Sequence, residues 1–248
     1  MQIRGILFDW GGTLAHVDGQ TDALLRGAAE ALRRLAGQAD PSLVQSMLAA
    51  AVEAEKAASN HPEYREVDLA ELLHDWAGAH GLAWADGQLD AALATICGHW
   101  VGAALTPVHG VRETLEALRA MGMTIGLVSN CFIPPSYCHD ELRQQGIAHL
   151  FDCTVFSSGV GYRKPSRHIY RQALRELAAA GGPADVGQIL FVGDSPAYDV
   201  MAPAALGMKT ALVSSHTGLW PAEDYERAQP DLRIDSVAEL PALLADLS

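Results

Sequence analysis

The sequence predicts an α/β fold, in which a doubly wound parallel sheet is joined to a small all-helical domain. Two observations predict this fold. Strand patterns alternate with helix patterns after Pro107, and a strand pattern at Ile3–Phe8 precedes a long stretch that contains helix patterns only. Alternating strands and helices imply parallel strands with helices on both faces of the sheet. We therefore expect an α/β core made of residues 1–16 and 105–248, and a helical domain at residues 17–104.

The first predicted strand, Ile3–Phe8, is an apolar run that ends at Asp9 and is followed by two glycines, which favours a buried strand and then a turn. In the helical stretch, apolar residues recur at spacings of three and four, as they do on one face of an α-helix. These spacings predict four helices, at Thr21–Leu35, Ser42–Ala58, Val67–His80 and Gln88–Trp100.

The remainder of the core alternates between the two patterns. The predicted strands are Thr124–Val128, Cys153–Phe156, Ile189–Val192, Thr210–Val213 and Leu232–Ile234. The predicted helices are Val111–Met121, Asp140–Gln145, Arg167–Ala180, Tyr198–Leu206 and Val237–Leu247. Ligands of open parallel sheets bind beyond the carboxyl ends of the strands, so the residues that follow each strand are the candidates for a functional site.

Composition excludes several classes of protein. The 248 residues carry a net charge of -13, with 17 Lys and Arg against 30 Asp and Glu. Nucleic-acid binding needs a dense basic face, so we expect no nucleic-acid partner. No apolar run reaches the roughly 18–20 residues that span a bilayer, and the first residues lack a secretory pattern. We therefore expect a cytoplasmic protein without a membrane partner, and the sequence leaves open whether it is a monomer or a homodimer.

Polar residues stand at four predicted strand ends. They are Asp9, Ser129 with Asn130, Lys164 in the loop Gly161–Ser166, and Asp194 with Ser195. Any one of them alone is more often a helix cap or a solvated loop residue. A carboxylate, a hydroxyl, an ammonium group and a second carboxylate at one edge of one sheet favour a catalytic site instead.

The segments that contain these residues are FDWGGTL (Phe8–Leu14), LVSN (Leu127–Asn130), GYRKPSRHIY (Gly161–Tyr170) and FVGDSPAYD (Phe191–Asp199), with GMKTALV (Gly207–Val213) after them. In order and spacing they resemble the motifs of the haloacid dehalogenase (HAD) superfamily of hydrolases. The resemblance implies a HAD-like Rossmannoid core, a mobile helical cap of the C1 type, and a reaction through an aspartyl intermediate.

The residue types suit phosphoryl transfer. A carboxylate such as Asp9 can attack phosphorus to give an acyl phosphate, which divides one difficult displacement into two easier ones. A strongly negative protein needs a cation beside that carboxylate, and Mg²⁺ typically takes one or two protein carboxylates and several waters. Asp194 is the expected second ligand. The resemblance adds the main-chain carbonyl of Gly11 as a ligand. Asp199, five residues after Asp194, would lie one helical turn further on and orient the metal's waters or Lys164.

The remaining site residues are expected to hold the phosphoryl group. Lys164 would neutralise both the nucleophile and the transferring group, and it is one of only three lysines in the chain. Ser129 and Asn130 are the predicted side-chain contacts of the phosphoryl oxygens. Gly12 and Thr13 would contribute the amides of the turn after the nucleophile.

One residue departs from the phosphatase pattern. Phosphatases of this superfamily usually read DxDGT, with the second Asp as general acid and base, whereas this chain has Gly11 at that position. Positioned proton transfer contributes roughly 10²- to 10⁴-fold, so the substitution removes about 3–5 kcal/mol of catalysis unless another group replaces it. His16 has a suitable pKa for that task, but an ordinary linker residue is the more frequent role for such a position.

Two further reactions and one inactive state remain open. Superfamily members without the second Asp include metal-free dehalogenases and phosphonate hydrolases, which use a cap lysine, and Lys56 is the only candidate lysine here. Asp194 and Asp199 argue against the dehalogenase, because carboxylates facing Asp9 would hinder a metal-free mechanism. A phosphate-binding module without turnover is the third alternative.

We therefore predict a Mg²⁺-dependent hydrolase of a small organic phosphate, acting through an aspartyl-phosphate. The helical domain should select the substrate. Its one polar, turn-like stretch, His61–Arg65, could face the site and place Arg65 on a second anionic group of the substrate.

Overall fold

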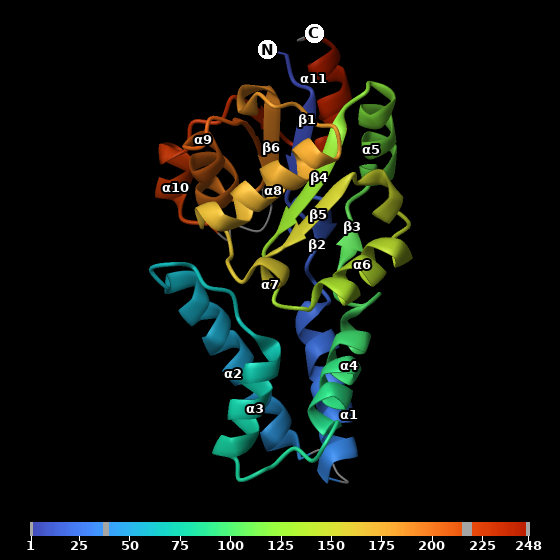
Figure 1. Ribbon diagram of the computed structural model, residues 1–248, viewed down its shortest axis with the longest axis vertical. Helices are drawn as coiled ribbons and strands as arrows, with labels where there is room; N and C mark the ends of the chain where they lie inside the picture. Colours follow the sequence, from blue (N-terminus) through green and yellow to red (C-terminus); the bar gives the residue numbers. More distant parts are fainter. Residues whose placement is uncertain (1, 37–39, 215–219, 247–248) are drawn as a thin grey trace.

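The computed structural model describes residues 2–36, 40–214 and 220–246, and Figure 1 shows them as a sheet with surrounding helices above a separate group of helices. We call the sheet and its helices the core, and helices α1 to α4 (residues 20–100) the helical unit. Both chain ends lie at the end of the core that points away from the helical unit (Figure 1).

A six-stranded parallel sheet forms the centre of the core, in the order β5-β4-β1-β6-β7-β8. Its strands are β1 (Gly5–Phe8), β4 (Thr124–Ser129), β5 (Cys153–Phe156), β6 (Ile189–Gly193), β7 (Lys209–Val213) and β8 (Leu232–Ile234). The chain builds the sheet outwards from β1 to β5 and then returns to the other side of β1 with β6. The strand order therefore reverses beside β1, which is where α/β sheets bind ligands. The predicted fold class is confirmed.

The sheet is buried on both faces, as its apolar sequence predicts. In β1, Ile6 and Phe8 belong to one buried cluster, whereas Leu7 between them belongs to another, because successive side chains of a strand point to opposite faces. The cluster around Leu7 includes Ile169 and Tyr170 of α8 (Arg167–Ala179), which packs against β4 and β5.

The other helical elements of the core lie between the strands or after the last one. They are α5 (Val111–Ala120), α6 (Pro135–Gln144), η1 (Ala148–Leu150), α7 (Ser157–Val160), η2 (Val186–Gln188), η3 (Pro196–Met201), α9 (Ala202–Ala204), α10 (Ala222–Arg227), η4 (Val237–Glu239) and α11 (Leu240–Asp246). Leu247, the last residue of the predicted C-terminal helix, lies outside the described residues.

Three helices differ clearly from their predicted extent: the predicted helix Val237–Leu247 begins as the 3-10 helix η4, so that α11 starts only at Leu240, and proline explains the other two differences. Helix α6 begins at Pro135 rather than at Asp140, because proline is well suited to the first position of a helix. The predicted helix Tyr198–Leu206 is instead the π-helix η3 followed by the short helix α9. Pro203 has no N–H to donate to a carbonyl in the preceding turn, so a regular helix cannot run through this segment.

The helical unit consists of α1 (Gln20–Ala36), α2 (Pro41–Asn60), α3 (Leu69–Ala79) and α4 (Gln88–Trp100), close to the predicted helices. Helix α1 packs against α4 and α2, and α3 packs against α2 and α4. Within the described ranges, no helix combines the length and the hydropathy that membrane crossing requires. The domain boundaries at residues 16 and 105, and the role of this unit as a cap, stay predictions.

A two-stranded ribbon marks the passage between the core and the helical unit. Strand β2 (Ala15–His16) pairs antiparallel with β3 (Thr106–Pro107), so the outgoing and returning chains run side by side. The sequence did not predict this ribbon, because two residues are too few to show a strand pattern.

Candidate active site

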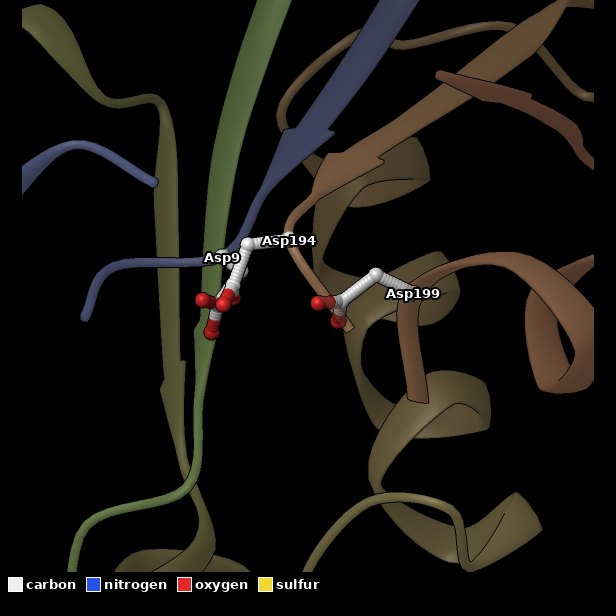
Figure 2. Close-up of side chains that lie close together, drawn as sticks. All are labelled: Asp9, Asp194 and Asp199. Carbon is white, nitrogen blue, oxygen red and sulfur yellow. The ribbon is translucent and has the colours of Figure 1, made fainter. Parts of the chain in front are cut away.

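Three acidic side chains meet at the carboxyl ends of two neighbouring strands. Asp9 follows β1 and Asp194 follows β6, and the two strands pair in parallel with Phe8 opposite Val192, so both residues leave the sheet side by side. The main-chain N–H of Asp9 donates to the carbonyl of Val192 at 2.9 Å. Asp199 approaches from η3, and one carboxylate oxygen of each of the three residues lies within 4.8 Å of the others (Figure 2). We call these three residues the acidic cluster.

Lys164 brings an ammonium group into the acidic cluster. Its Nζ atom donates to Asp9 Oδ1 at 2.6 Å and to Asp199 Oδ1 at 2.8 Å, and its side chain is buried. The side-chain amide of Asn130 holds the main chain of Lys164 from both sides. The Lys164 N–H donates to Asn130 Oδ1 at 2.7 Å, and Asn130 Nδ2 donates to the Lys164 carbonyl at 3.1 Å. Asn130 therefore fixes the position of Lys164.

Local hydrogen bonds fix the other two carboxylates. The N–H of Ser195 donates to Asp199 Oδ2 at 2.9 Å, which holds Asp199 at the start of the wide turn of η3. Trp220 Nε1 donates to Asp194 Oδ2 at 3.1 Å. Each acidic side chain is thus oriented before any ligand arrives.

The turn after Asp9 packs directly on Asp194. Gly12 has a φ of +83°, and a Cβ atom at this position would lie 2.8 Å from the carboxyl carbon of Asp194. Glycine is therefore required both by the backbone conformation and by the close approach. The hydroxyl of Thr13 donates to Asp9 Oδ2 at 3.2 Å, so Thr13 contacts the predicted nucleophile.

The electrostatics of the cluster leave negative charge in excess. Burial raises the pKa of Asp194 to about 6, and the charge of Asp9 adds to this shift. Burial also raises the pKa of Asp199 to about 7, although the ammonium group of Lys164 acts in the opposite direction. Burial disfavours the charged form of Lys164, but Asp199 and Asp9 outweigh it and raise its pKa above the usual value. One ammonium group faces three carboxyl groups, and the protein interior screens their repulsion poorly.

The donor set of the acidic cluster fits a hard divalent cation. Mg²⁺ prefers carboxylate oxygens and keeps part of its water shell, and its double charge would offset the excess of negative charge. Across residues 2–36, 40–214 and 220–246, this is the one group of three or more His, Cys, Asp or Glu side chains that could hold a metal ion.

A cavity of about 190 Å³ opens beside the cluster, between the core and the helical unit. The core lines it with the cluster, Lys164, Gly11, Ser129 and Asn130 among others, and the helical unit contributes Gln20, Glu55 and Trp100. Trp10, which follows the predicted nucleophile, packs edge-on against Trp100 with ring centroids 6.0 Å apart. Gly12 and Thr13, predicted to contact phosphate, do not line this cavity.

Three residues considered as further participants lie elsewhere. His16 is exposed in the β2–β3 ribbon. Lys56 is exposed, with its nearest acidic partner, Glu53, 4.0 Å away. Arg65 is exposed as well, paired with Glu63 at 3.1 Å, and none of the three lines the cavity.

A larger hollow of about 520 Å³ lies elsewhere on the core, along β5 and α8. Its lining includes His139, His168 and Arg171 but no member of the acidic cluster. Volume alone would favour this hollow, but convergent titratable groups identify a site better than size does.

Sequence reasoning missed several residues of the cavity wall, among them Glu55, Arg163, Tyr198 and Trp220. Arg163 and Tyr198 lie inside recognised motifs, next to Lys164 and Asp199, and this proximity was the available signal. Glu55 and Trp220 reach the site only through tertiary packing, so no local pattern marks them.

The fold is that of an α/β protein with a helical insertion after its first strand. The site adds a candidate nucleophile, a buried ammonium group and carboxylates that could bind a metal ion, all at the carboxyl edge of the sheet. Residues 3–207 match the family model described as haloacid dehalogenase-like hydrolase, and the chain belongs to this family.

Relatives of the chain carry different names. It is 31% identical over 153 residues to the pyrimidine 5'-nucleotidase YjjG of Escherichia coli. The matched residues make up 62% of this chain and 60% of the relative. It is 25% identical over 248 residues to a glyceraldehyde 3-phosphate phosphatase of Methanopyrus kandleri, with 99% of both chains covered. A 2-haloacid dehalogenase structure from Pseudomonas syringae covers all of both chains, with a TM-score of 0.72 and 20% identity. This last likeness shows the fold alone.

Proposed function

We propose that the protein is a Mg²⁺-dependent phosphatase that hydrolyses a small organic phosphate through an aspartyl-phosphate on Asp9. The observation that supports this most strongly is the buried contact of Lys164 with Asp9 and Asp199, beside the third carboxylate of Asp194. The two curated relatives, from Escherichia coli and Methanopyrus kandleri, are named as enzymes of phosphate esters, which supports the same class of substrate.

In the proposed reaction, a carboxylate oxygen of Asp9 attacks phosphorus, and the ester P–O bond breaks as the alcohol leaves. Water then attacks the phosphorus of the acyl phosphate, which releases inorganic phosphate and restores Asp9. Lys164 and Thr13 already contact opposite oxygens of the Asp9 carboxylate, so the nucleophile needs little reorientation. Lys164 is also placed to neutralise the transferring group, and Ser129 lines the cavity where its oxygens would lie.

Asp9, Asp194 and the carbonyl of Gly11 would hold Mg²⁺. When bound, the ion supplies the positive charge that allows a phosphate dianion to approach a carboxylate. Asp199 has a supporting role in this proposal, because its two oxygens accept from Lys164 and from the Ser195 N–H and thereby set the position of the ammonium group.

The described residues suit the two rival reactions less well. A phosphonate hydrolase needs an amine from the helical unit, but Lys56 is largely exposed and does not line the cavity. A metal-free dehalogenase would place a carboxylate nucleophile against two further buried carboxyl groups, whose charge opposes the attack on a haloacid anion.

The test is phosphate release from a panel of sugar phosphates, nucleotides and short phosphomonoesters, with Mg²⁺ and with EDTA. We expect turnover that requires Mg²⁺ and that Asp9→Asn abolishes, because a neutral amide cannot attack phosphorus. Asp90→Asn, at an exposed position of α4, is the matched control and should retain activity. Halide release from a 2-haloacid without metal would overturn the proposal. Failure of the Mg²⁺-loaded protein to bind fluoroberyllate would indicate an inactive pocket.

A further inference from the structure

Arg163 is a second buried cation in the same cavity, directly before Lys164 in the chain. Its side chain is 7% exposed and lies against the helical unit and the segment that follows α2. Nη2 donates to Glu55 Oε1 at 3.2 Å, and Nη1 donates to the Glu55 carbonyl at 3.3 Å and to Glu66 Oε1 at 3.5 Å. The guanidinium group is therefore positioned by two acidic residues outside the core.

The two acidic partners of Arg163 differ in burial. The side chain of Glu66 is 2% exposed and therefore enclosed by protein, whereas that of Glu55 is 47% exposed. An ion pair with a partner this exposed contributes little to stability, because water screens its charge. Glu55 can therefore release the guanidinium group and turn to solvent at small cost, while Glu66 keeps Arg163 in place.

Hydrogen-bond donors of this wall are left without acceptors. Arg163 Nε is buried and has no partner among the described residues, and the same holds for the Nε1 atoms of Trp10 and Trp100. All three residues line the cavity. Buried N–H groups are almost always paired with protein or ordered water, so three unpaired donors in residues that line one cavity show that the hydrogen bonding of this wall is incomplete.

Arg163 is not needed to hold the helical unit on the core. Main-chain bonds already join the two parts, because the Arg163 N–H donates to the Tyr64 carbonyl at 2.9 Å and the Glu66 N–H donates to the Gly161 carbonyl at 3.1 Å. Arg65 and Tyr162 form an antiparallel bridge at the same place. The guanidinium group is thus available for a task other than docking.

We infer that Arg163 binds a carboxylate of the substrate, and that the substrate is a phosphorylated carboxylic acid with a short carbon skeleton. When no substrate is present, Glu55 pairs with the guanidinium group of Arg163. When substrate binds, its carboxylate replaces Glu55 as the partner of Arg163. This inference rests on the proposed phosphatase function, because Lys164 and the acidic cluster must take the phosphoryl end. Arginine suits the other end, since its planar fork matches a carboxylate in two parallel hydrogen bonds.

The size of the cavity supports a short skeleton. Its volume of about 190 Å³ is below the roughly 300–1,000 Å³ that is usual for pockets of drug-sized ligands. A substrate ammonium group is the less suitable alternative, because Glu55 and Glu66 already share their carboxylates with Arg163.

The experiment compares 2-phosphoglycolate with 2-hydroxyethyl phosphate, which has the same carbon skeleton with a hydroxymethyl group in place of the carboxylate. We expect the wild-type protein with Mg²⁺ to prefer phosphoglycolate by about 10- to 100-fold in kcat/KM. Arg163→Gln should bring this selectivity ratio close to one, and Arg163→Lys should restore only part of it. Glu55→Gln should raise the ratio, mainly through a lower KM, because the internal competitor for Arg163 is gone.

Glu53→Gln is the matched control, since Glu53 lies on the same helix, is 73% exposed and does not line the cavity. Its ratio should equal that of the wild type. The inference is overturned if the wild-type ratio is one or less, or if Arg163→Gln lowers both rates equally. A lower ratio for Glu55→Gln would also overturn it, because Glu55 would then bind the substrate itself.

A binding measurement keeps this inference separate from the proposed function. Phosphonoacetate carries a phosphonate and a carboxylate but no ester to hydrolyse. In the presence of Mg²⁺ it should raise the melting temperature of the wild-type protein more than methylphosphonate does, and Arg163→Gln should remove the difference. If neither ester is hydrolysed, no selectivity ratio is obtained, and this binding comparison decides whether Arg163 recognises a carboxylate. The proposed function itself fails only if no ester of the wider panel is hydrolysed.

Discussion

Lys164 and Arg163 are neighbours in the chain and both are buried, yet their surroundings differ. Lys164 contacts two carboxylates of the core, Asp9 and Asp199, which are buried like the lysine itself. Arg163 contacts two acidic residues outside the core, and one of them, Glu55, is half exposed. One cation is therefore enclosed in a fixed site, and the other sits at a boundary between two parts of the molecule.

Under the proposed function, this difference separates two tasks. Bond breaking needs groups held in one geometry, which the parallel strands supply at Asp9 and Asp194 and the side-chain amide of Asn130 supplies at Lys164. Selection among substrates needs a group in the cavity wall that can change its hydrogen-bond partner. Arg163 has that property, because its partner Glu55 is half exposed. We therefore expect changes at Lys164 to abolish turnover and changes at Arg163 to alter preference.

The largest expected effect comes from Lys164→Met. Removing one partner from a buried ion pair costs about 3–5 kcal/mol, because Asp9 and Asp199 would lose their counter-charge. Loss of a group that stabilises the transferring charge should also lower phosphate release by about 10²- to 10³-fold or more. Urea unfolding with EDTA and phosphate release with Mg²⁺ measure the two effects.

Lys209→Met is the control for this variant, because Lys209 is 41% exposed and pairs with Asp231 at the surface. It should change the free energy of unfolding by about 0–1 kcal/mol. Glu55→Gln, which removes the charge of the exposed partner of Arg163, should likewise change the free energy of unfolding by about 0–1 kcal/mol. If Lys164→Met and Glu55→Gln destabilise the protein equally, the contrast between the two cations is wrong.

Without metal, the protein should lose stability as the pH rises. An aspartate side chain in the unfolded chain has an ordinary pKa of 3.8, whereas in the folded protein the pKa of Asp194 rises to about 6 and that of Asp199 to about 7. Between these values the folded state holds more protons than the unfolded state, so the free energy of unfolding falls with increasing pH. Between about pH 4.5 and 7.5 the shift of Asp194 alone corresponds to a loss on the order of 2 kcal/mol, which urea unfolding in EDTA measures.

Mg²⁺ should oppose this loss, because it binds the ionised carboxylates that the higher pH produces. Asp194→Asn removes one of the titrating groups and should make the pH dependence in EDTA shallower. Asp86→Asn, at an exposed position between α3 and α4, should leave the dependence unchanged. An identical pH dependence in the wild type and in Asp194→Asn would contradict the assignment.

The fixed site could largely be predicted from the sequence. Asp9 and Asp194 each follow a short apolar strand, and two parallel strands that are neighbours in a sheet bring the residues after them together. That β1 and β6 are neighbours is a long-range pairing, and the resemblance to the superfamily motifs implied it, because no local pattern does. The chemistry of the side chains then indicates a cation, which is why the geometry of the acidic cluster agrees with the expectation.

The part of the cavity wall that Arg163 and Glu55 form could not be predicted in the same way. Arg163 and Glu55 are 108 residues apart, and no periodicity links them. The polar, turn-like character of the segment His61–Arg65 favoured Arg65 instead of Arg163. This segment does lie against the loop Gly161–Ser166, as the bridge between Arg65 and Tyr162 shows. Side chains of extended residues alternate in direction, however, and the Arg65 guanidinium lies over the Tyr162 ring, 5.1 Å from its centroid, outside the cavity.

The smallest effect is expected from Gly11→Asp. Gly11 lines the cavity between the core and the helical unit. A Cβ atom at position 11 would meet a methyl group of Val17 at 2.9 Å, and Val17 is exposed enough to move aside. The new carboxyl group can donate a proton to the leaving alcohol, which the chain lacks at this position. Hydrolysis of alkyl phosphates should therefore rise by about 10-fold, below the full range for general acid catalysis.

Aryl phosphates give the sharper readout for this variant, because a phenolate with a low pKa leaves without help from an acid. Their rate should change little in Gly11→Asp, so the ratio of alkyl to aryl hydrolysis should increase. Gly11→Asn has nearly the same volume and no acidic proton, and it should show no increase. If both variants slow both substrates to the same extent, the glycine provides room for the substrate at the boundary, and the missing acid is supplied from elsewhere in the cavity wall.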